Sequence, residues 1–373
     1  MKENVSKKIF VAMSGGVDSS VAALLLKNNG YDVTGVFMRC YNIDGCAERD
    51  ATDARLVAEK LEIPFYVWDF EEEYKKKVVN YMIDGYKRGI TPNPDVECNR
   101  EIKFGLFFKK ALTAGANFIA TGHYVRSDGK NLFEAKDKNK DQSYFLWTLR
   151  PEQVEKAIFP IGDYLKSEVR KMAKDADLPT ANKKDSQGIC FLGKFSVQDF
   201  LKSYLPVKKG LVFTSAGLKV GEHDGAHFYT IGQRHGLNLG TKNKELKVGG
   251  KVETKAHYVA SKDIKNNTIV VAEGSEDEAL YKKEVVLHDV NFINTSYSSV
   301  LKNIGIDGVE VFARVRYRQP LVKARITNNE SGIRLVFDRP VRFVASGQSA
   351  VFYARASSNE FQMMGGGIIV AAV

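Results

Sequence analysis

Cysteine is scarce in this chain, and the four that occur follow no metal-binding or disulfide pattern. Cys40, Cys46, Cys98 and Cys190 include no C-x-x-C pair and no paired spacing typical of zinc ligands. So few cysteines are typical of an intracellular chain that keeps them as thiols rather than of a disulfide-stapled secreted protein. The sequence therefore predicts no structural zinc site and no disulfide framework.

Long apolar runs are also missing. No stretch approaches the roughly 18 consecutive apolar residues of a membrane span. Residues 1–4 are polar and lack the apolar core of a signal peptide. The sequence shows no internal repeats and no long low-complexity tract. We therefore expect a cytoplasmic protein without a membrane partner.

The chain does have length, apolar content and positive charge. Its 373 residues are enough for two or three domains, and 44% hydrophobic residues can build a packed core. The formal net charge of +10 suits a polyanionic partner such as a nucleic acid. Charge alone does not decide the partner, because many basic proteins simply carry solvated positive surfaces.

The order of predicted elements changes along the chain. Up to about residue 205, strand-like segments alternate with helix-like ones, which favours a Rossmann-like parallel sheet covered by helices. From Pro206 the strands are short, and from Glu284 the alternation of apolar and polar residues indicates a β-barrel or sandwich. The predicted fold is therefore α/β with domains at 1–205, 206–283 and 284–373, of which the middle one is small and β-rich.

A Gly-rich turn after the first predicted strand is the most informative segment. Residues 13–20 read M-S-G-G-V-D-S-S and lead into a predicted helix. Gly15 and Gly16 let the backbone approach a ligand closely, and amides at a helix N-terminus attract an anion. Because no lysine follows as in an ordinary P-loop, we expect another kind of phosphate-binding turn. The alternative is a plain strand–turn–helix in which Ser19 or Ser20 caps the helix.

Two further segments carry cysteines. Residues 91–99 read T-P-N-P-D-V-E-C-N, and the two prolines predict an extended loop. A helix beginning near Asn99 would place Cys98 at its positive end, which favours the thiolate; a buried cysteine in a capping turn is the alternative. Cys190 lies in a glycine-flanked segment with two lysines nearby, which favours a reactive thiol, although its apolar neighbours favour a core position.

Residues 309–318 alternate in a way that separates two faces of a strand. Arg314, Arg316 and Arg318 fall on one face and apolar side chains fall on the other. This pattern predicts a half-buried strand whose basic outer face contacts phosphates. A solvated strand face without a partner is the alternative.

Together these segments resemble one known family. The chain contains S-G-G-V-D-S, N-P-D-x-x-C-N, T-G-H-Y, K-D-Q-S-Y, K-K-D-S-x-G-I-C-F and G-Q-R-x-G, in this order. The set is similar to that of the bacterial tRNA-specific 2-thiouridylases, which belong to the PP-loop ATP pyrophosphatase superfamily. Two separated cysteines distinguish them from other PP-loop enzymes. The resemblance implies an N-terminal PP-loop domain (adenine nucleotide alpha hydrolase-like), a central domain and a C-terminal β-barrel that contacts tRNA.

The resemblance also implies a reaction. Members of the family use ATP to adenylate O2 of the wobble uridine (U34) of tRNA, and then replace that oxygen with sulfur from a cysteine persulfide. By motif position, Cys190 carries the persulfide, Cys98 is the nucleophile that forms a transient disulfide with it, and Asp95 acts as a general acid or base. Two routes stay open: direct attack by the persulfide, and prior release of hydrosulfide.

The same motif match implies the ligand contacts. ATP is expected to contact Ala12, Met13, Ser14, Gly15, Gly16, Val17, Asp18, Ser19, Met38 and Gly122. Mg²⁺ is expected with ATP, and Asp18 is expected either to help hold this ion, because hard cations prefer oxygen ligands, or to orient the pyrophosphate. The target base is expected to contact Asn93, Pro94 and Asp95. The residues expected to contact tRNA are His123, Lys140, Asp141, Gln142, Arg316, Tyr317 and Gln348.

The expected partners are tRNAs for Lys, Glu and Gln and a sulfur-donor protein, either a cysteine desulfurase or a sulfur-relay protein. Two rival functions are a PP-loop ligase that acts on a small molecule and a non-catalytic RNA-binding module. The first rival needs neither two separated cysteines nor a basic β-region. The second needs no intact Gly-rich turn.

Overall fold

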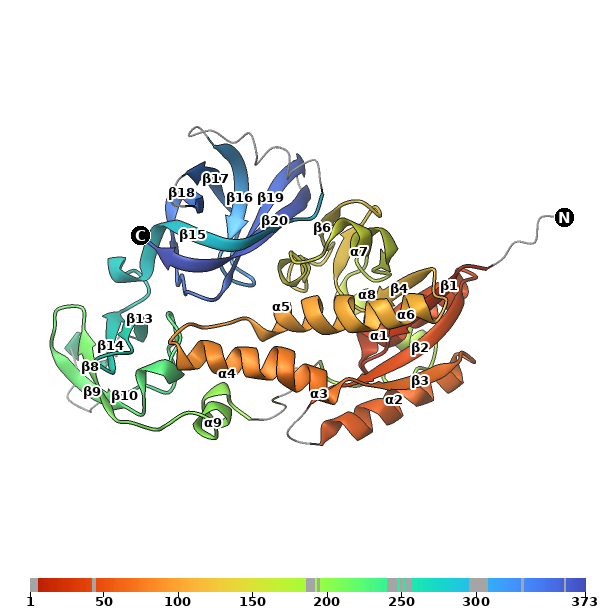
Figure 1. The fold of residues 1–373 in the computed structure, drawn as a ribbon, viewed down its shortest axis with the longest axis horizontal. Coiled ribbons are helices and arrows are strands. Elements are labelled where there is room, and N and C mark those ends of the chain that lie inside the picture. Colours follow the sequence, from red (N-terminus) through yellow and green to blue (C-terminus); the bar gives the residue numbers. More distant parts are fainter. Residues whose placement is uncertain are drawn as a thin grey trace.

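Three structural parts follow one another along the chain. The computed structural model describes residues 6–41, 45–185, 192, 195–239, 247–248, 251–252, 256–294, 308–329, 332–358 and 360–373. Figure 1 shows an α/β part in red to yellow, a β part in green and a β-barrel in blue. Within the described ranges, no helix combines the length and apolar character needed to cross a membrane.

The N-terminal part is built on a five-stranded parallel sheet. Its strand order is β3-β2-β1-β4-β7, and every neighbouring pair is parallel. The strands are β1 (Lys8–Ala12), β2 (Asp32–Arg39), β3 (Phe65–Asp69), β4 (Phe118–Thr121) and β7 (Ala157–Ile158). Successive side chains of a strand alternate between faces, so Ile9 and Val11 enter one core and Phe10 enters another. This confirms the predicted Rossmann-like sheet.

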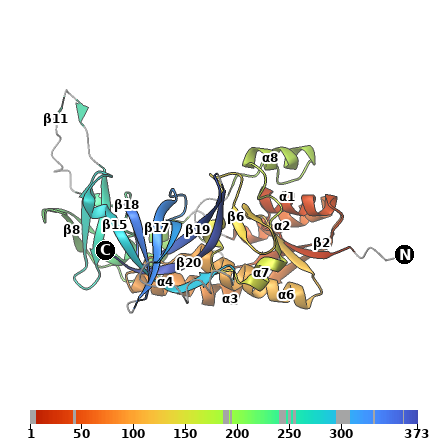
Figure 2. The same ribbon diagram turned by 90° about the horizontal axis from the view of Figure 1, so that it is seen from above.

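Helices cover both faces of this sheet (Figure 2). One face carries α1 (Val17–Asn28), α2 (Cys46–Lys60) and α8 (Lys166–Asp175). The other face carries α7 (Pro151–Lys156) and two long continuous helices. The first consists of α3 (Glu71–Tyr74), η1 (Lys75–Val79) and α4 (Asn80–Lys87), and the second of α5 (Pro94–Cys98), η2 (Asn99–Phe107) and α6 (Phe108–Thr113). Both η segments are π-helical, and the two long helices lie side by side beneath the barrel (Figure 1).

The central part is a small sheet of order β10-β9-β8-β14-β13, in which β8 and β14 are parallel. Its strands are β8 (Gly210–Thr214), β9 (Lys219–His223), β10 (Asn238–Leu239), β13 (His257–Asp263) and β14 (Thr268–Glu273). A separate pair is formed by β11 (Lys247–Val248) and β12 (Lys251–Val252). The flanking helical segments are α9 (Val197–Lys202), η4 (Ala226–Phe228) and η5 (Glu278–Leu280).

Six antiparallel strands form the C-terminal part, and pairing of β15 with β20 closes them into a barrel. They are β15 (Tyr281–Phe292), β16 (Val309–Arg314), β17 (Val322–Asn329), β18 (Gly332–Arg342), β19 (Ser349–Ser357) and β20 (Glu360–Ala372). Leu335, Phe337 and Phe352 are fully buried in its core. The structure therefore confirms the barrel and excludes the sandwich that alternation alone allowed.

A hairpin from the N-terminal part extends the barrel sheet. β5 (Val125–Ser127) pairs with β6 (Leu132–Glu134), and β6 pairs with β20, where Phe133 lies opposite Gln362. The 3-10 turn η3 (Ser143–Phe145) lies in the same region, with Ser143 Oγ 3.0 Å from Tyr353 Oη. The first and third parts are thus joined by a shared sheet, which brings residues distant in the sequence to one place.

One expectation about the barrel surface is wrong. β16 ends at Arg314, so Arg316 and Arg318 lie beyond the strand that was expected to reach residue 318. Arg314 itself is only 6% exposed instead of lying on a basic outer face. Arg314 forms ion pairs with Glu134 and Asp141, because the N-terminal part covers this face of the strand. Alternation separated the two faces of the strand correctly but could not distinguish solvent from a contact between parts of the chain.

Candidate active site

The Gly-rich turn lies at the carboxyl end of β1, where parallel sheets bind ligands. Gly15 has φ +71°, and a Cβ there would lie 2.3 Å from the carbonyl oxygen of Asp50. Gly16 is the N-cap residue of α1, and no side chain caps this helix. The expected cap by Ser19 or Ser20 is therefore wrong, because the helix begins earlier, at Val17. Both hydroxyls instead donate to the carbonyl oxygen of Gly16.

Neighbouring residues hold the turn in a fixed shape. Ser19 Oγ accepts a hydrogen bond of 3.1 Å from the backbone N of Ser14. Gly122, directly after β4, packs against the start of α1, since a Cβ there would lie 2.7 Å from the backbone N of Ser19. Ala12 and Met13 are buried, and Met38 is half-buried on the neighbouring strand β2. The structure thus brings the residues expected to contact ATP to one end of the sheet.

Asp18, on the first turn of α1, is held by two side chains that the motif match did not include. Lys166 of α8 donates to both carboxylate oxygens at 2.7 and 2.8 Å, and Tyr124 donates its hydroxyl at 2.9 Å. Lys166 supplies a positive charge beside the turn, the feature that the turn's own sequence lacks. Sequence patterns could not reveal this pairing, because Lys166 is one of many lysines and follows the turn by almost 150 residues.

Lys166 also reaches a second carboxylate. Asp185 accepts from Lys166 at 2.9 Å, from Lys140 at 2.6 Å and from Arg170 at 2.6 Å. Desolvation acts to raise the pKa of Asp185, but the hydrogen bonds from Lys140 and Lys166 outweigh it and lower the pKa to about 2. Asp185 precedes Cys190 by five residues in the sequence. Cys190 itself lies outside the described residues.

The proline-rich segment is helical sooner than expected. α5 begins at Pro94, and Asn93 caps it by accepting from the backbone N of Val96 at 3.3 Å. Proline is tolerated at this first helical position, because no intrahelical partner is lost there. The expectation of an extended loop with a helix starting near Asn99 is therefore wrong. Cys98 is the last residue of α5 and is buried, so it does not lie at the positive end of the helix.

Asp95 and His123 lie near one cation, Lys103 of η2. Lys103 Nζ is 3.4 Å from His123 Nε2, and His123 Nδ1 is 2.8 Å from Thr121 Oγ1. Burial raises the pKa of Asp95, and the charge of Lys103 opposes this rise. Burial also lowers the pKa of His123 well below its usual value, and Lys103 lowers it further. His123 directly follows Gly122, so the Gly-rich turn and this polar group are neighbours.

Residues from the other two parts hold the segment that precedes α5. Gln348 of the barrel donates to the carbonyl oxygens of Thr91 and Pro92 at 2.9 and 3.3 Å. Ser346 accepts from the backbone N of Thr91. In the central part, Thr230 Oγ1 accepts from Thr91 Oγ1 at 3.2 Å. Through this contact the central part touches the segment before α5. Sequence reasoning missed Thr230, which lies just before the G-Q-R-x-G motif.

The remaining residues expected to contact tRNA fall into two groups. Arg316 and Tyr317 are half-buried, and the Tyr317 ring lies 4.5 Å from the Phe145 ring. Burial lowers the pKa of Arg316. In the second group, Asp141 is only 2% exposed and pairs with Arg314, and Gln142 accepts from the backbone N of Tyr124. Asp141 therefore faces the interior, whereas Arg316 and Tyr317 keep part of their surface exposed.

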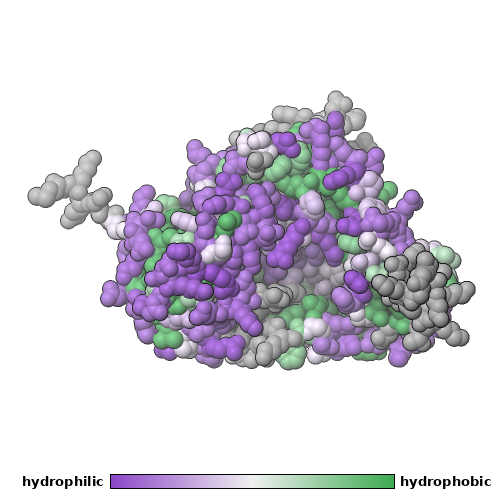
Figure 3. Space-filling view, turned by 180° about the vertical axis from the view of Figure 1, so that it is seen from behind, coloured by the Kyte–Doolittle hydropathy of each residue, from purple (hydrophilic) through white to green (hydrophobic). Residues whose placement is uncertain are grey.

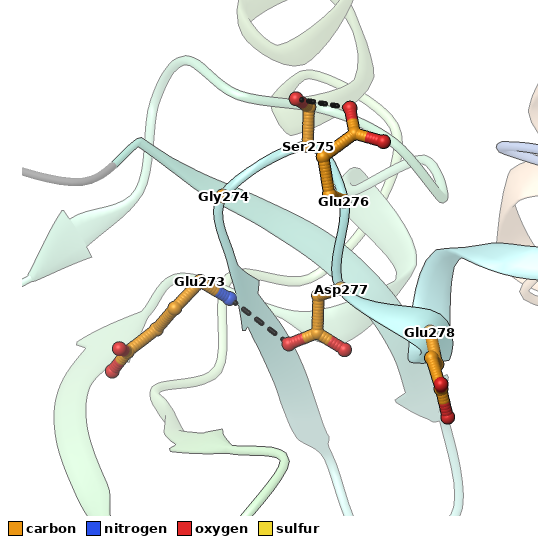
Figure 4. Close-up of a pocket in the computed structure, with 6 residues that line it drawn as sticks. All are labelled: Glu273, Gly274, Ser275, Glu276, Asp277 and Glu278. Atoms are coloured by element: carbon orange, nitrogen blue, oxygen red, sulfur yellow. Dashed lines mark hydrogen bonds between the residues drawn. The ribbon is translucent and has the colours of Figure 1, made fainter.

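The face of the molecule opposite to that of Figure 1 is hollowed. Figure 3 shows a mostly hydrophilic surface that is hollowed between the N-terminal part and the rest. Another hollow, at the loop between β14 and β15, is lined by residues 273–278, whose carboxylates point in different directions (Figure 4). Among the described residues, no group of three or more His, Cys, Asp or Glu could hold a metal ion. The described acidic side chains of this loop do not form such a group.

Three family models match consecutive segments of the chain. They describe a tRNA methyl transferase HUP domain at residues 7–194, a tRNA methyl transferase PRC-barrel domain at 198–273 and an aminomethyltransferase beta-barrel domain at 282–369. A tRNA-specific 2-thiouridylase MnmA of Staphylococcus epidermidis is 43% identical over 361 residues, which are 94% of this chain and 93% of that protein. The chain belongs to the tRNA-specific 2-thiouridylase MnmA family.

Other relatives of this family agree along nearly the whole chain. The MnmA 1 protein of Geobacillus kaustophilus is 45% identical over 93% of this chain and 92% of its own. The MnmA protein of Francisella philomiragia is 41% identical over 98% of this chain and 99% of its own. MnmA membership therefore covers all three parts of the structure.

Solved structures are similar over only part of the chain. An NMN synthetase from Francisella tularensis has TM-score 0.33 and 17% identity, and covers 49% of this chain and 67% of its own. A 4-thiouridine synthetase–RNA complex with bound ATP has TM-score 0.33 and 18% identity, and covers 53% of this chain and 50% of its own. At these TM-scores the likeness adds nothing to the MnmA assignment.

Proposed function

We propose that this chain is an ATP-dependent tRNA 2-thiouridylase that converts the wobble uridine to 2-thiouridine. One observation carries the proposal: Gly122 packs against the Gly-rich turn, and the adjacent His123 lies beside the helix that carries Asp95 and Cys98. The Gly-rich turn and the helix that carries the buried Cys98 are thus neighbours, which supports a site where ATP activates an oxygen and sulfur replaces it.

The Gly-rich turn is proposed to bind the phosphates of ATP. Its glycines leave the backbone accessible, α1 points its positive end at the turn, and Lys166 supplies a cation. Asp18 is proposed to hold Mg²⁺ together with the phosphates, because a single carboxylate and phosphate oxygens suit this ion. Bound Mg²⁺ would neutralise charge that develops on the phosphates.

The proposed reaction begins with activation of the uracil oxygen. Uracil O2 bonds to the α-phosphorus of ATP and pyrophosphate leaves. The terminal sulfur of a Cys190 persulfide attacks C2, and AMP leaves with the oxygen. The Cys98 thiolate then attacks Sγ of Cys190, which breaks the persulfide S–S bond, leaves sulfur on C2 and forms a Cys98–Cys190 disulfide. A thiol reductant must reduce this disulfide before the next turnover.

The partners follow from the proposed reaction. The anticodon loop of a tRNA is proposed to enter where Asn93 caps α5, since loop bases can be splayed out and read in a pocket. Gln348 of the barrel already contacts the carbonyl oxygens of Thr91 and Pro92 beside this place. Arg316 and Tyr317 are proposed to contact the loop as well. The tRNAs for Lys, Glu and Gln, and a cysteine desulfurase or sulfur-relay protein as donor, are proposed partners. The proposed location is the cytoplasm.

Methyl transfer is the competing function, because two matching models are named for it. The relatives that match over the whole chain are named thiouridylases. The glycine-rich, anion-binding turn and the buried Cys98 also fit ATP-driven sulfur transfer, whereas methyl transfer uses no nucleotide triphosphate. A small-molecule ligase is disfavoured because the barrel and the central part both contact the segment before α5.

Cys98→Ser and Cys190→Ser test the proposal most directly. Each should abolish 2-thiouridine formation while tRNA-dependent pyrophosphate release continues, because activation precedes sulfur transfer. Nucleosides from treated tRNA are analysed by mass spectrometry, and pyrophosphate release is measured in parallel. Cys40→Ser is the matched control and should keep full thiolation. Normal 2-thiouridine formation by Cys98→Ser or Cys190→Ser would show that the two-cysteine mechanism is wrong.

A further inference from the structure

A lysine outside the matched motifs lies beside His123 in the candidate active site. Lys103 is half-buried on η2, and its Nζ contacts Nε2 of His123 at 3.4 Å. Its positive charge also acts on Asp95, eight residues earlier on the same long helix. Among the described residues, Lys103 is the charged group that acts on both Asp95 and His123.

The π-helical segment explains how Lys103 reaches this position. In a regular α-helix, residues eight apart are rotated from each other by roughly 80° around the axis. η2 begins directly after Cys98, and its i→i+5 turns rotate less per residue, which brings Lys103 back toward the side of Asp95. Gly105 marks the wide turn, since a Cβ there would lie 2.8 Å from the carbonyl oxygen of Arg100, five residues earlier.

His123 fixes the lysine from the other side. The low pKa of His123 keeps its ring neutral, so Nε2 can accept a hydrogen bond from the Lys103 ammonium group. The protonated Nδ1 then donates to Thr121 Oγ1. The rings of Phe104 and Phe159 lie 6.1 and 6.4 Å from the His123 ring and exclude water on this side. Because water is excluded there, the positive charge of Lys103 acts more strongly on a nearby carboxylate.

We propose that Lys103 is a positioning residue that favours the charged carboxylate of Asp95 against the effect of burial, so that Asp95 serves as the base of the reaction. The inference rests on the proposed function. When uracil O2 attacks the α-phosphorus, the N3–H proton moves to the Asp95 carboxylate, and the N–H electron pair forms an N3=C2 double bond. After sulfur has replaced the oxygen, the same proton returns from Asp95 to N3. Asp95 therefore ends each turnover as the carboxylate with which it began.

The test is the pH dependence of tRNA-dependent pyrophosphate release in a single turnover. Lys103→Met removes the charge that opposes the raised pKa of Asp95, so the loss of rate on the acid side should begin at higher pH. The expected displacement is on the order of 1 pH unit, and the rate should recover as pH rises. Lys103→Arg keeps the charge and should stay close to the wild-type profile.

Two matched variants separate this role from a structural one. Lys109→Met removes an exposed lysine from the same long helix and should leave the profile unchanged. In an Asp95→Asn background, Lys103→Met should produce no further displacement, because the group it acts through is gone. Lys103→Gln serves as a second neutral variant, and thermal unfolding confirms that each variant is folded.

A rate that falls by the same factor at every pH in Lys103→Met, or an unchanged profile, overturns the inference. Wild-type protein that forms no 2-thiouridine under the same conditions instead overturns the proposed function. The two failures are distinguishable because the first leaves wild-type thiolation intact.

Discussion

The two segments that form the candidate site are held in different ways. The Gly-rich turn keeps its shape largely through its own residues, with Ser19 bonded to the backbone of Ser14 and Gly16. The segment before α5 is held by Gln348 and Thr230, which lie 257 and 139 positions away from Thr91. The Gly-rich turn, which is proposed to bind ATP, is therefore shaped by residues close together in the sequence. The segment before α5, which is proposed to bind tRNA, takes its place only after all three parts of the chain have docked.

Gly15→Ala should have the largest effect, and it tests the Gly-rich turn. The added Cβ would meet the Asp50 carbonyl oxygen at 2.3 Å and would sit on a residue with positive φ, which costs on the order of 1–3 kcal/mol in strain alone. The turn must shift, so we expect ATP binding, measured by calorimetry, and pyrophosphate release to be lost.

Gly30→Ala is the matched control for this change. Gly30 also has positive φ, at +79°, but nothing lies within 4 Å of an added Cβ. It should lower the free energy of unfolding slightly and leave ATP affinity unchanged. Equal loss of ATP affinity in both variants would show that strain, rather than the shape of the turn, is responsible.

Gln348→Leu should have an intermediate effect, confined to the segment before α5, which all three parts of the chain contact. It removes the hydrogen bonds to Thr91 and Pro92, each worth about 1 kcal/mol. Together they correspond to a fall in thiolation of up to roughly thirtyfold, while ATP affinity should stay the same.

Gln319→Leu provides the comparison for Gln348→Leu, because Gln319 makes a similar 2.9 Å bond to a backbone carbonyl, that of Arg342, elsewhere in the barrel. It should leave thiolation unchanged. If both variants lose thiolation equally, contact between the barrel and the segment before α5 does not position the base.

Asp185→Asn should have the smallest effect, mainly on stability at low pH. The folded-state pKa of Asp185 is lowered to about 2, so its carboxylate contributes stability above its unfolded pKa. That contribution is lost as the pH falls from the unfolded pKa towards about 2. Unfolding by denaturant should therefore depend less on pH in the variant over this acid range.

Asp175→Asn, which removes an exposed ion pair with Lys171 on α8, is the control for Asp185→Asn. Exposed pairs contribute little to stability, so its acid profile should match that of the wild type. A wild-type acid profile in Asp185→Asn as well would mean that the three cations around Asp185 do not stabilise the folded state.

Sequence reasoning succeeded where the signal was local. The βαβα order predicted the parallel sheet, and the glycines after β1 predicted a turn that the structure places at the correct edge. It failed at Pro94, which begins a helix instead of extending a loop, and at Arg314, which is buried against Glu134 and Asp141. The domain boundaries, the Cys98–Cys190 disulfide and the individual ligand contacts stay predictions.

The amino-acid sequence by itself determined the Gly-rich turn and the family, because these depend on short runs of residues. Only the tertiary structure decided that Lys166 pairs with Asp18, that Lys103 contacts His123, and that Thr230 and Gln348 hold Thr91. Those contacts join residues far apart in the chain. They depend on how helices and sheets pack, which no short pattern encodes.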